Sequence, residues 1–212
     1  MPTLLDVHAM PRGARSRTRK LRDAFVRGYL HKHPDAGHIV VDLAHGFDQL
    51  PVFDEWDIET KFEIFYGEGK LDDDMAARWN ALTTLTDQLH AADVIVVSSP
   101  MWNFSIPWML KRWIDAVVQP KLTFEVKDGT FHGLLGGRTG VILATRDSTY
   151  APGTLHAALD HQVPYLRQVF GVMGIAPIHT VIAEPLAYSG HEKAEQVLET
   201  AMGEAEQLGA SL

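Results

Sequence analysis

Short apolar runs alternate along the chain with longer stretches in which apolar residues recur at helical spacing. The runs are rich in β-branched and aliphatic residues, which is typical of strands. Two of them are almost continuously apolar, as expected of parallel strands covered on both faces. The five predicted strands cover residues 3–7, 38–42, 93–98, 138–145 and 178–183.

The stretches between these strands predict amphipathic helices. One follows the first strand, from about residue 16 to 33, and another begins at Pro107. Pro164 opens a third helix, which ends before Gly174, and a fourth runs from about 194 to 208. Strands that alternate with helices indicate right-handed crossovers. We therefore expect an α/β fold with a doubly wound, five-stranded parallel sheet in a three-layer α/β/α arrangement.

The chain shows no internal division. No repeat, low-complexity stretch or linker interrupts the 212 residues, so we expect a single domain over residues 1–212. Residues 43–75 are acidic and weakly patterned, and we expect them to form a long excursion over the surface. In such a sheet, ligands bind beyond the carboxyl ends of the strands, which directs attention to the loops after the first, third and fourth strands.

Composition narrows the class of protein. The chain has no cysteine, which excludes thiol catalysis, cysteine-ligated zinc and disulfides. Its eleven histidines are scattered without an HExxH motif, so no metal site is expected. The net charge of −8 disfavours a nucleic-acid partner. Arginines interrupt the first twenty residues, and no uncharged apolar run approaches the ~18 residues of a membrane span, so we expect a cytoplasmic protein with no membrane partner.

The loop after the first strand combines hydroxyls with positive charge. Ser16 is a candidate N-cap, and Thr18 offers a second hydroxyl beside the free N–H groups of the helix start. Arg15 and Arg17 lie in a run of six cations without an acid, between Arg12 and Arg22. A phosphate group would meet these donors and the positive end of the helix dipole. The alternative is that Ser16 only caps the helix while the arginines point into water.

The loop after the third strand is rigid and aromatic. Two prolines bracket the sequence, which reads PMWNFSIP from Pro100 to Pro107 and displays Trp102, Asn103 and Phe104. Aromatic side chains with one amide fit a planar heterocycle, which takes apolar contact on its face and hydrogen bonds on its edge. The alternative is a local aromatic cluster of Trp102, Phe104 and Trp108. The loop after the fourth strand, from Thr145, adds polar groups at the same edge.

Several motifs of other nucleotide-binding or hydrolytic folds are missing. The first loop contains no GxGxxG, and the chain contains neither GxxxxGK[ST] nor GxSxG. These absences argue against a dinucleotide-binding fold, a P-loop NTPase and an α/β-hydrolase.

The sequence around Pro100–Phe104 resembles the FMN-dependent NADH:quinone oxidoreductases, known as azoreductases. Their PMYNF pattern is followed by a Leu-Lys helix that ends near an Asp and then by a Thr-Phe dipeptide. In this chain the corresponding residues are Leu110-Lys111, Asp115 and Thr123-Phe124. Further matches at Pro164–Leu166, Gly171, Gly174-Ile175 and Ala183-Glu184 extend the resemblance over nearly the whole chain.

The resemblance implies a flavodoxin-like homodimer that holds FMN near the subunit interface. It assigns three loops to the cofactor and two aromatic residues to the walls of the acceptor pocket. The phosphate loop is Ser16, Arg17 and Thr18; the loop for the isoalloxazine and ribityl groups is Pro100, Met101, Trp102, Asn103 and Phe104; the third loop begins with Thr145 and Arg146; the acceptor walls are Phe124 and Tyr150.

Three positions depart from the family pattern. Met10 stands where the family has an early serine of the first loop, so one expected phosphate hydroxyl is missing. Asp147 and Ser148 replace a Gly-Gly pair, which changes backbone freedom and polarity beside the flavin. Trp102 replaces the common tyrosine. These departures bear on substrate preference and redox potential more than on FMN binding.

The reaction that the resemblance implies is electron transfer from NADH or NADPH to a quinone or azo compound through FMN, with ping-pong kinetics. The cofactor carries the chemistry, so no side chain is nominated as catalytic. Backbone N–H groups around Asn103 and Phe104 are expected to stabilise negative charge on the flavin. Two alternatives are a flavodoxin-type electron carrier without enzymatic activity and a phosphoesterase that works without flavin.

Overall fold

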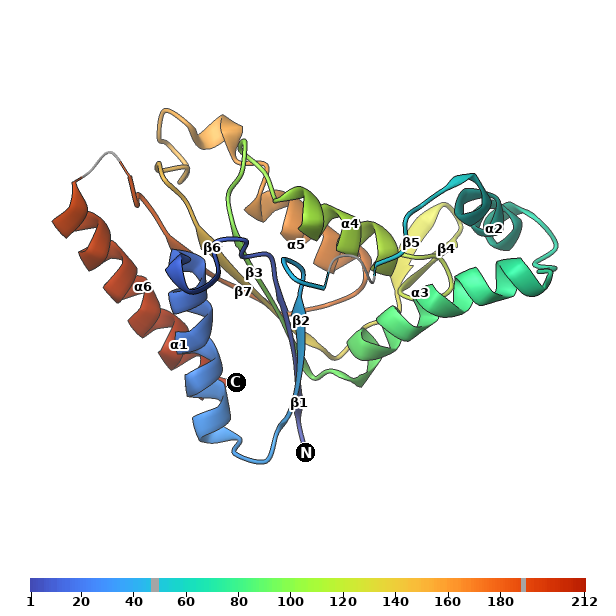
Figure 1. Cartoon of the computed structure of the whole chain (residues 1–212), viewed down its shortest axis with the longest axis horizontal. Coiled ribbons are helices and arrows are strands. Elements are labelled where there is room, and N and C mark those ends of the chain that lie inside the picture. The colour runs from blue at the N-terminus through green and yellow to red at the C-terminus, as the bar shows by residue number, and fades with distance from the viewer. Residues whose placement is uncertain (47–49, 188–189) are drawn as a thin grey trace.

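A computed structural model describes residues 1–46, 50–187 and 190–212 of the chain. Its centre is a parallel sheet of five strands in the order β2-β1-β3-β6-β7, with helices on both faces (Figure 1). The expected doubly wound, three-layer α/β/α fold is confirmed, and the strand order is the flavodoxin-like one. The strands are β1 (Thr3–His8), β2 (Gly37–Asp42), β3 (Val94–Pro100), β4 (Phe124–Lys127), β5 (Thr130–Gly133), β6 (Thr139–Thr145) and β7 (Ile178–Ala183).

The helices divide between the two faces of the sheet. α1 and α6 cover one face, while α3, α4 and α5 cover the other (Figure 1). Successive residues of β1 point to opposite faces of the sheet: Leu4 packs toward α1, and Leu5 packs toward the helices on the other face. The helices are α1 (Arg17–Lys32), α2 (Glu55–Tyr66), α3 (Asp73–Ala91), α4 (Trp108–Val117), α5 (Val163–Val172) and α6 (His191–Ser211), with 3₁₀ turns η1 (Gly13–Arg15) and η3 (Ala157–Leu159).

Two glycines bring α1 and α6 into backbone contact. A Cβ atom on Gly28 would lie 2.1 Å from the carbonyl oxygen of Glu206, and one on Gly209 would lie 2.2 Å from that of Phe25. No side chain fits at these distances. The guanidinium of Arg27 adds a pair of hydrogen bonds to the carboxylate of Glu206, at 2.8 and 2.6 Å. α6 therefore holds α1 firmly against the sheet.

The region 43–75, expected to form a long excursion over the surface, contains helical structure. Residues 47–49 lie outside the described part, but Glu55–Tyr66 forms α2 and residue 73 begins α3. Acidic residues open both helices: Asp54 forms a capping box with Asp57, and Asp72 caps α3. The apolar periodicity of this segment is weak because α2 buries only Thr60 and Ile64. The β4–β5 hairpin, which the sequence analysis did not predict, follows from the Asp128-Gly129 turn.

The carboxyl ends of β1, β3 and β6 bring three loops to one edge of the sheet. The amide of Ala9 donates to the carbonyl of Ser98 at 3.1 Å, and that of Met101 donates to the carbonyl of Thr145 at 2.9 Å. These bonds continue the ladders past the ends of the strands. The loops that the sequence analysis singled out are therefore neighbours in space. In the described part of the chain, no helix has the length and apolarity to cross a bilayer.

Candidate functional site

The start of α1 provides backbone donors at the sheet edge. Ser16 is the N-cap, as predicted, and its hydroxyl accepts from the amide of Arg19 at 3.3 Å. The amides of Arg17 and Thr18 come before the helical hydrogen-bond pattern and have no partner within the helix. Ser16 and Thr18 are both buried. The hydroxyl of Ser16 therefore caps the helix while two N–H groups at its start stay available to a ligand.

The charge around this helix start is unusual. Its first turn reads Arg17-Thr18-Arg19-Lys20, with no acidic residue, and Arg15 precedes it in η1. Cations at a helix N-terminus oppose the macrodipole by about 0.3–1 kcal/mol each when exposed. Arg19 and Lys20 form only long ion pairs: the Arg19 guanidinium lies 3.7 Å from the carboxylate of Asp23, and the Lys20 ammonium lies 3.8 Å from that of Glu195. An anion bound at the helix start would relieve this unfavourable arrangement.

A tight turn follows β3. Trp102 and Ser105 exchange two backbone hydrogen bonds of 2.9 Å, and the residues between them, Asn103 and Phe104, have φ values of 46° and 69°. Two consecutive positive φ angles define a type I′ turn, which normally selects Asn and Gly. An aromatic residue in this region costs roughly 1–2 kcal/mol. Among the described residues, the amides of Asn103 and Phe104 have no acceptor.

The first two loops and β6 enclose a cavity of about 240 Å³, which we name the loop cavity. Eight of the ten residues predicted to bind a cofactor line it, and Thr18 and Thr145 are linked by a 2.6 Å hydrogen bond between their hydroxyls. Its lining also includes residues that the sequence analysis had not assigned to the site. The residues are Pro11, Arg12, Ser16, Arg17, Thr18, Pro100, Met101, Trp102, Thr145, Arg146, Asp147 and Leu186.

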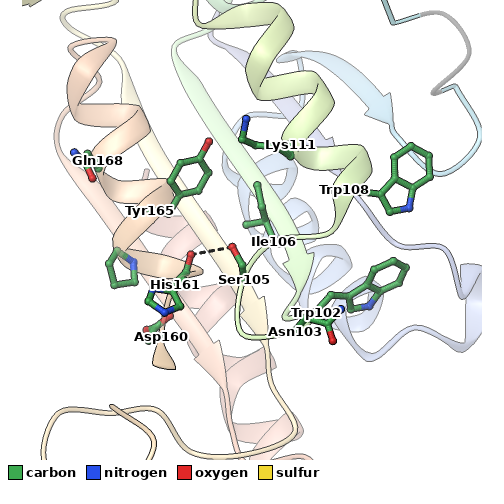
Figure 2. Close-up of a pocket in the computed structure, with 11 residues that line it drawn as sticks. Trp102, Asn103, Ser105, Ile106, Trp108, Lys111, Asp160, His161, Tyr165 and Gln168 are labelled. Atoms are coloured by element: carbon green, nitrogen blue, oxygen red, sulfur yellow. Dashed lines mark hydrogen bonds between the residues drawn. The ribbon is translucent and has the colours of Figure 1, made fainter. Parts of the chain in front are cut away.

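A larger cavity of about 710 Å³ lies on the other side of the Trp102–Ser105 turn, between α4 and α5. Figure 2 shows its side chains; we name it the helix cavity. Trp102 lines both cavities, so they adjoin at this residue. Asn103 lines the helix cavity, whereas Phe104 lines neither and is 46% exposed. The lining is Trp102, Asn103, Ser105, Ile106, Trp108, Lys111, Asp160, His161, Pro164, Tyr165 and Gln168.

The two predicted acceptor residues lie apart from each other. Tyr150 places its ring 5.6 Å from the guanidinium carbon of Arg146, at the sheet edge. Phe124 is buried in the hairpin, against the rings of Phe65 and Phe131, and lines a third cavity of about 490 Å³ beside α2. Tyr165 borders both this cavity and the helix cavity. The role of Phe124 and Tyr150 stays a prediction.

Burial shifts the pKa values of groups around these cavities. It lowers the pKa of Lys61, which lines the cavity beside α2, and raises that of Tyr165. At the end of β1, burial lowers the pKa of His8 against the opposing effect of Asp6 and Asp42. Burial therefore makes the charged forms of Lys61 and His8 less favourable than they are in exposed side chains.

Comparison with known proteins places this geometry in a family. A family model described as a flavodoxin-like fold matches residues 2–208. An FMN-dependent NADH:quinone oxidoreductase of Nitratidesulfovibrio vulgaris is 34% identical over 195 residues, which cover 92% of each chain. The chain belongs to this flavodoxin-like family of quinone oxidoreductases. The resemblance drawn from the PMWNF sequence is thereby confirmed.

Other members are similar over the same length. An FMN-dependent NAD(P)H:quinone oxidoreductase of Pseudomonas aeruginosa is 34% identical over 212 residues, covering 98% of this chain and 96% of its own. The crystal structure of an azoreductase from Bacillus anthracis superimposes with a TM-score of 0.89 at 27% identity, with both chains covered completely.

The departures from the pattern of these quinone oxidoreductases can now be placed. Met10 is buried, so its side chain offers nothing to the loop cavity. Asp147 is exposed and lines that cavity, and its carbonyl accepts from the amide of Ala187. Trp102 is 38% exposed at the junction of the two cavities. Compared with the family pattern, the chain therefore lacks one hydroxyl near the start of α1 and carries an added carboxylate there.

The side chain of Arg146, which was predicted to bind the cofactor, is held by neighbouring side chains. It is buried, and most of its N–H groups donate to Gln162, Asp160 and Glu184. The predicted contact with a cofactor is left to the small part of Arg146 that faces the loop cavity. Asp160, His161 and Gln162 escaped the sequence analysis because they stand in a weakly patterned segment and not directly after a strand.

Proposed function

We propose that this protein is an FMN-dependent NAD(P)H:quinone oxidoreductase that also reduces azo compounds. One observation carries the proposal: a helix start with free amides and surplus cations adjoins, through Trp102, an open aromatic cavity. The helix start suits a phosphate and the aromatic cavity suits a planar ring. The named activities of its relatives support this assignment.

The loop cavity fits the phosphate end of a mononucleotide. Ser16, Arg17 and Thr18, which form the start of α1, line the cavity, and Arg12 adds a positive charge. At about 240 Å³ the loop cavity is too small for a whole flavin, since ligand sites usually measure about 300–1,000 Å³. A ring attached to this phosphate would extend past Trp102 toward the helix cavity.

The Trp102–Ser105 turn is suited to binding the isoalloxazine ring of FMN. Its strained residues leave the amides of Asn103 and Phe104 without an acceptor in the described chain, so they are available to stabilise negative charge. Bound FMN would supply hydride acceptance and electron donation. Trp102, Asn103 and Trp108 then position the reactants and exclude water. Because one helix cavity adjoins this turn, donor and acceptor would occupy it in succession, which predicts ping-pong kinetics.

We also infer a homodimer. Trp56, Phe62 and Tyr66 on α2 and Phe131 on the hairpin are each more than half exposed. Phe62, Tyr66 and Phe131 are linked by ring contacts through Phe65 and Phe124, and form an aromatic surface beside the cavity that Phe124 lines. Surfaces of this kind mark association sites. Light scattering should report twice the mass of the chain for the wild type, and Phe62→Glu should give a monomer. Val40→Glu, at a half-exposed position on β2, is the control that should stay dimeric.

The decisive test of function is the visible spectrum of the purified protein after FMN is added and excess ligand removed. We expect bound flavin, and rapid anaerobic bleaching when NADH or NADPH is supplied. A protein that retains flavin but bleaches slowly would be an electron carrier. A protein that stays colourless would contradict the proposal and leave the phosphoesterase alternative.

A further inference from the structure

A buried network links the segment before α5 to both ends of the loop after β3. At its centre the guanidinium of Arg146 donates to both carboxylate oxygens of Asp160, at 3.0 and 2.9 Å, and to the side-chain oxygen of Gln162 at 3.0 Å. It also donates to Glu184 at 3.2 Å. The side chain of Arg146 is 1% exposed. One cation thus pairs with two carboxylates and orients a neutral amide.

The segment that Arg146 holds is bonded to the rigid loop at two places. At the start of the loop, the side-chain amide of Gln162 donates to the carbonyl and hydroxyl oxygens of Ser99, at 3.2 and 3.1 Å. At its far end, the amide of His161 donates to the carbonyl of Phe104 at 2.9 Å, and the hydroxyl of Ser105 donates to the carbonyl of His161 at 3.2 Å. Figure 2 shows the last of these bonds.

We propose that Arg146 is a positioning residue for the Trp102–Ser105 turn. Its guanidinium holds Asp160 and Gln162, and the peptide between them holds the strained residue Phe104. The turn keeps two positive φ angles that its own residues disfavour, so an external constraint is needed to maintain it. Arg146 supplies that constraint through Asp160 and Gln162. The role of the turn in binding flavin rests on the proposed function; the constraint itself does not.

The test uses Arg146→Met, which removes the charge and the planar donors at similar length. Arg138→Met is a matched control, because Arg138 adjoins the opposite end of β6 and also donates to three groups, the carbonyls of Leu89, His90 and Gly136. In the flavin-free protein, amide exchange followed by NMR should accelerate at least tenfold for Trp102, Ser105 and His161. Exchange at these amides should be unchanged in Arg138→Met. Equal exchange in the two variants would overturn the proposal.

Two further variants keep the test sharp. Arg146→Lys retains the positive charge but lacks the planar guanidinium with its several donors. It should therefore accelerate exchange of the same amides less than Arg146→Met does. If Arg146→Met fails to fold, Asp160→Asn weakens one arm of the network and should accelerate the amides of Ser105 and His161. Unchanged exchange at both positions in Asp160→Asn would contradict the proposal.

Ligand binding separates positioning of the turn from contact with the phosphate. With FMN and riboflavin as probes, Arg146→Met should raise both dissociation constants by the same factor, about tenfold. Weaker binding of FMN alone would mean that Arg146 acts on the phosphate and would overturn the assignment. If the wild type binds neither probe, the proposed function fails, whereas the exchange experiment still decides the role of Arg146.

Discussion

The hydroxyl oxygen of Thr18 lies 2.6 Å from that of Thr145, and both side chains are buried. This bond joins the first turn of α1 to the end of β6. Replacing either threonine by valine leaves the other hydroxyl unsatisfied, which costs about 1–3 kcal/mol of unfolding free energy. Replacing both should cost clearly less than the sum of the single variants. Urea unfolding of the three variants measures this coupling, and simple additivity would contradict it.

Ser16→Ala should impair the phosphate site and the helix together. Loss of the N-cap is expected to cost about 1 kcal/mol of stability. Asp72→Ala is the matched control, since it removes the N-cap of α3, away from the loop cavity. Both variants should lose similar stability by thermal unfolding. Only Ser16→Ala should reduce the preference for FMN over riboflavin in fluorescence titration; an equal preference in both variants would argue against a phosphate at this helix start.

The positive φ of Asn103 should restrict which side chains this position tolerates. Asn103→Gly should keep the turn with a change in stability below about 1 kcal/mol, because glycine adopts this region freely. Asn103→Val should destabilise the protein by more than about 1 kcal/mol, because a β-branched residue is disfavoured there. Asp128→Val tests the same backbone strain in the hairpin, at a φ of 51°. Flavin binding should weaken for Asn103→Val and stay close to wild type for Asp128→Val.

Stability should fall on acidification because of two buried groups on β1. Burial lowers the pKa of His8, so the unfolded chain binds this proton more readily as the pH drops below about 6.5. Burial alone would raise the pKa of Asp6, but bonds from His38, at 3.0 Å, and Arg22 outweigh it and lower the pKa. The contribution of Asp6 is present above the unfolded value near 4 and is lost as the pH falls through its folded pKa.

Urea unfolding at a series of pH values measures this dependence. His8→Gln should flatten the decline just below pH 6.5, while the loss at lower pH, due to Asp6, should remain. His191→Gln is the control, because His191 is exposed at the start of α6. A wild-type stability that rises as the pH drops from 7 to 5 would contradict the assignment.

The sequence predicted the sheet well because its strands carry strong patterns. β3 and β6 are buried on both faces, and their continuous apolar runs strongly predict buried parallel strands. α2 and the β4–β5 hairpin were missed because they are largely exposed, so that no apolar period distinguishes them. Their capping and turn residues, Asp54 and Asp128-Gly129, were the local evidence that was available.

The candidate site shows the same division. Pro100 and Thr145 could be found because they end strands with strong apolar patterns, and Ser16 because it caps the helix that follows β1. The burial of Arg146 could not be anticipated, since its partners Asp160 and Glu184 stand 14 and 38 residues away. Long-range pairing of this kind depends on how β6, β7 and α5 are arranged in space.

The glycine contact between α1 and α6 has a consequence for ligand binding. Because the two backbones touch at Gly28 and Gly209, α6 acts as a brace for the helix whose first turn faces the loop cavity. A bulky side chain at either glycine would push α1 outward and carry Ser16 away from Thr145. A substitution at Gly209 on α6 would then weaken ligand binding in the loop cavity, although no described residue of α6 lines that cavity.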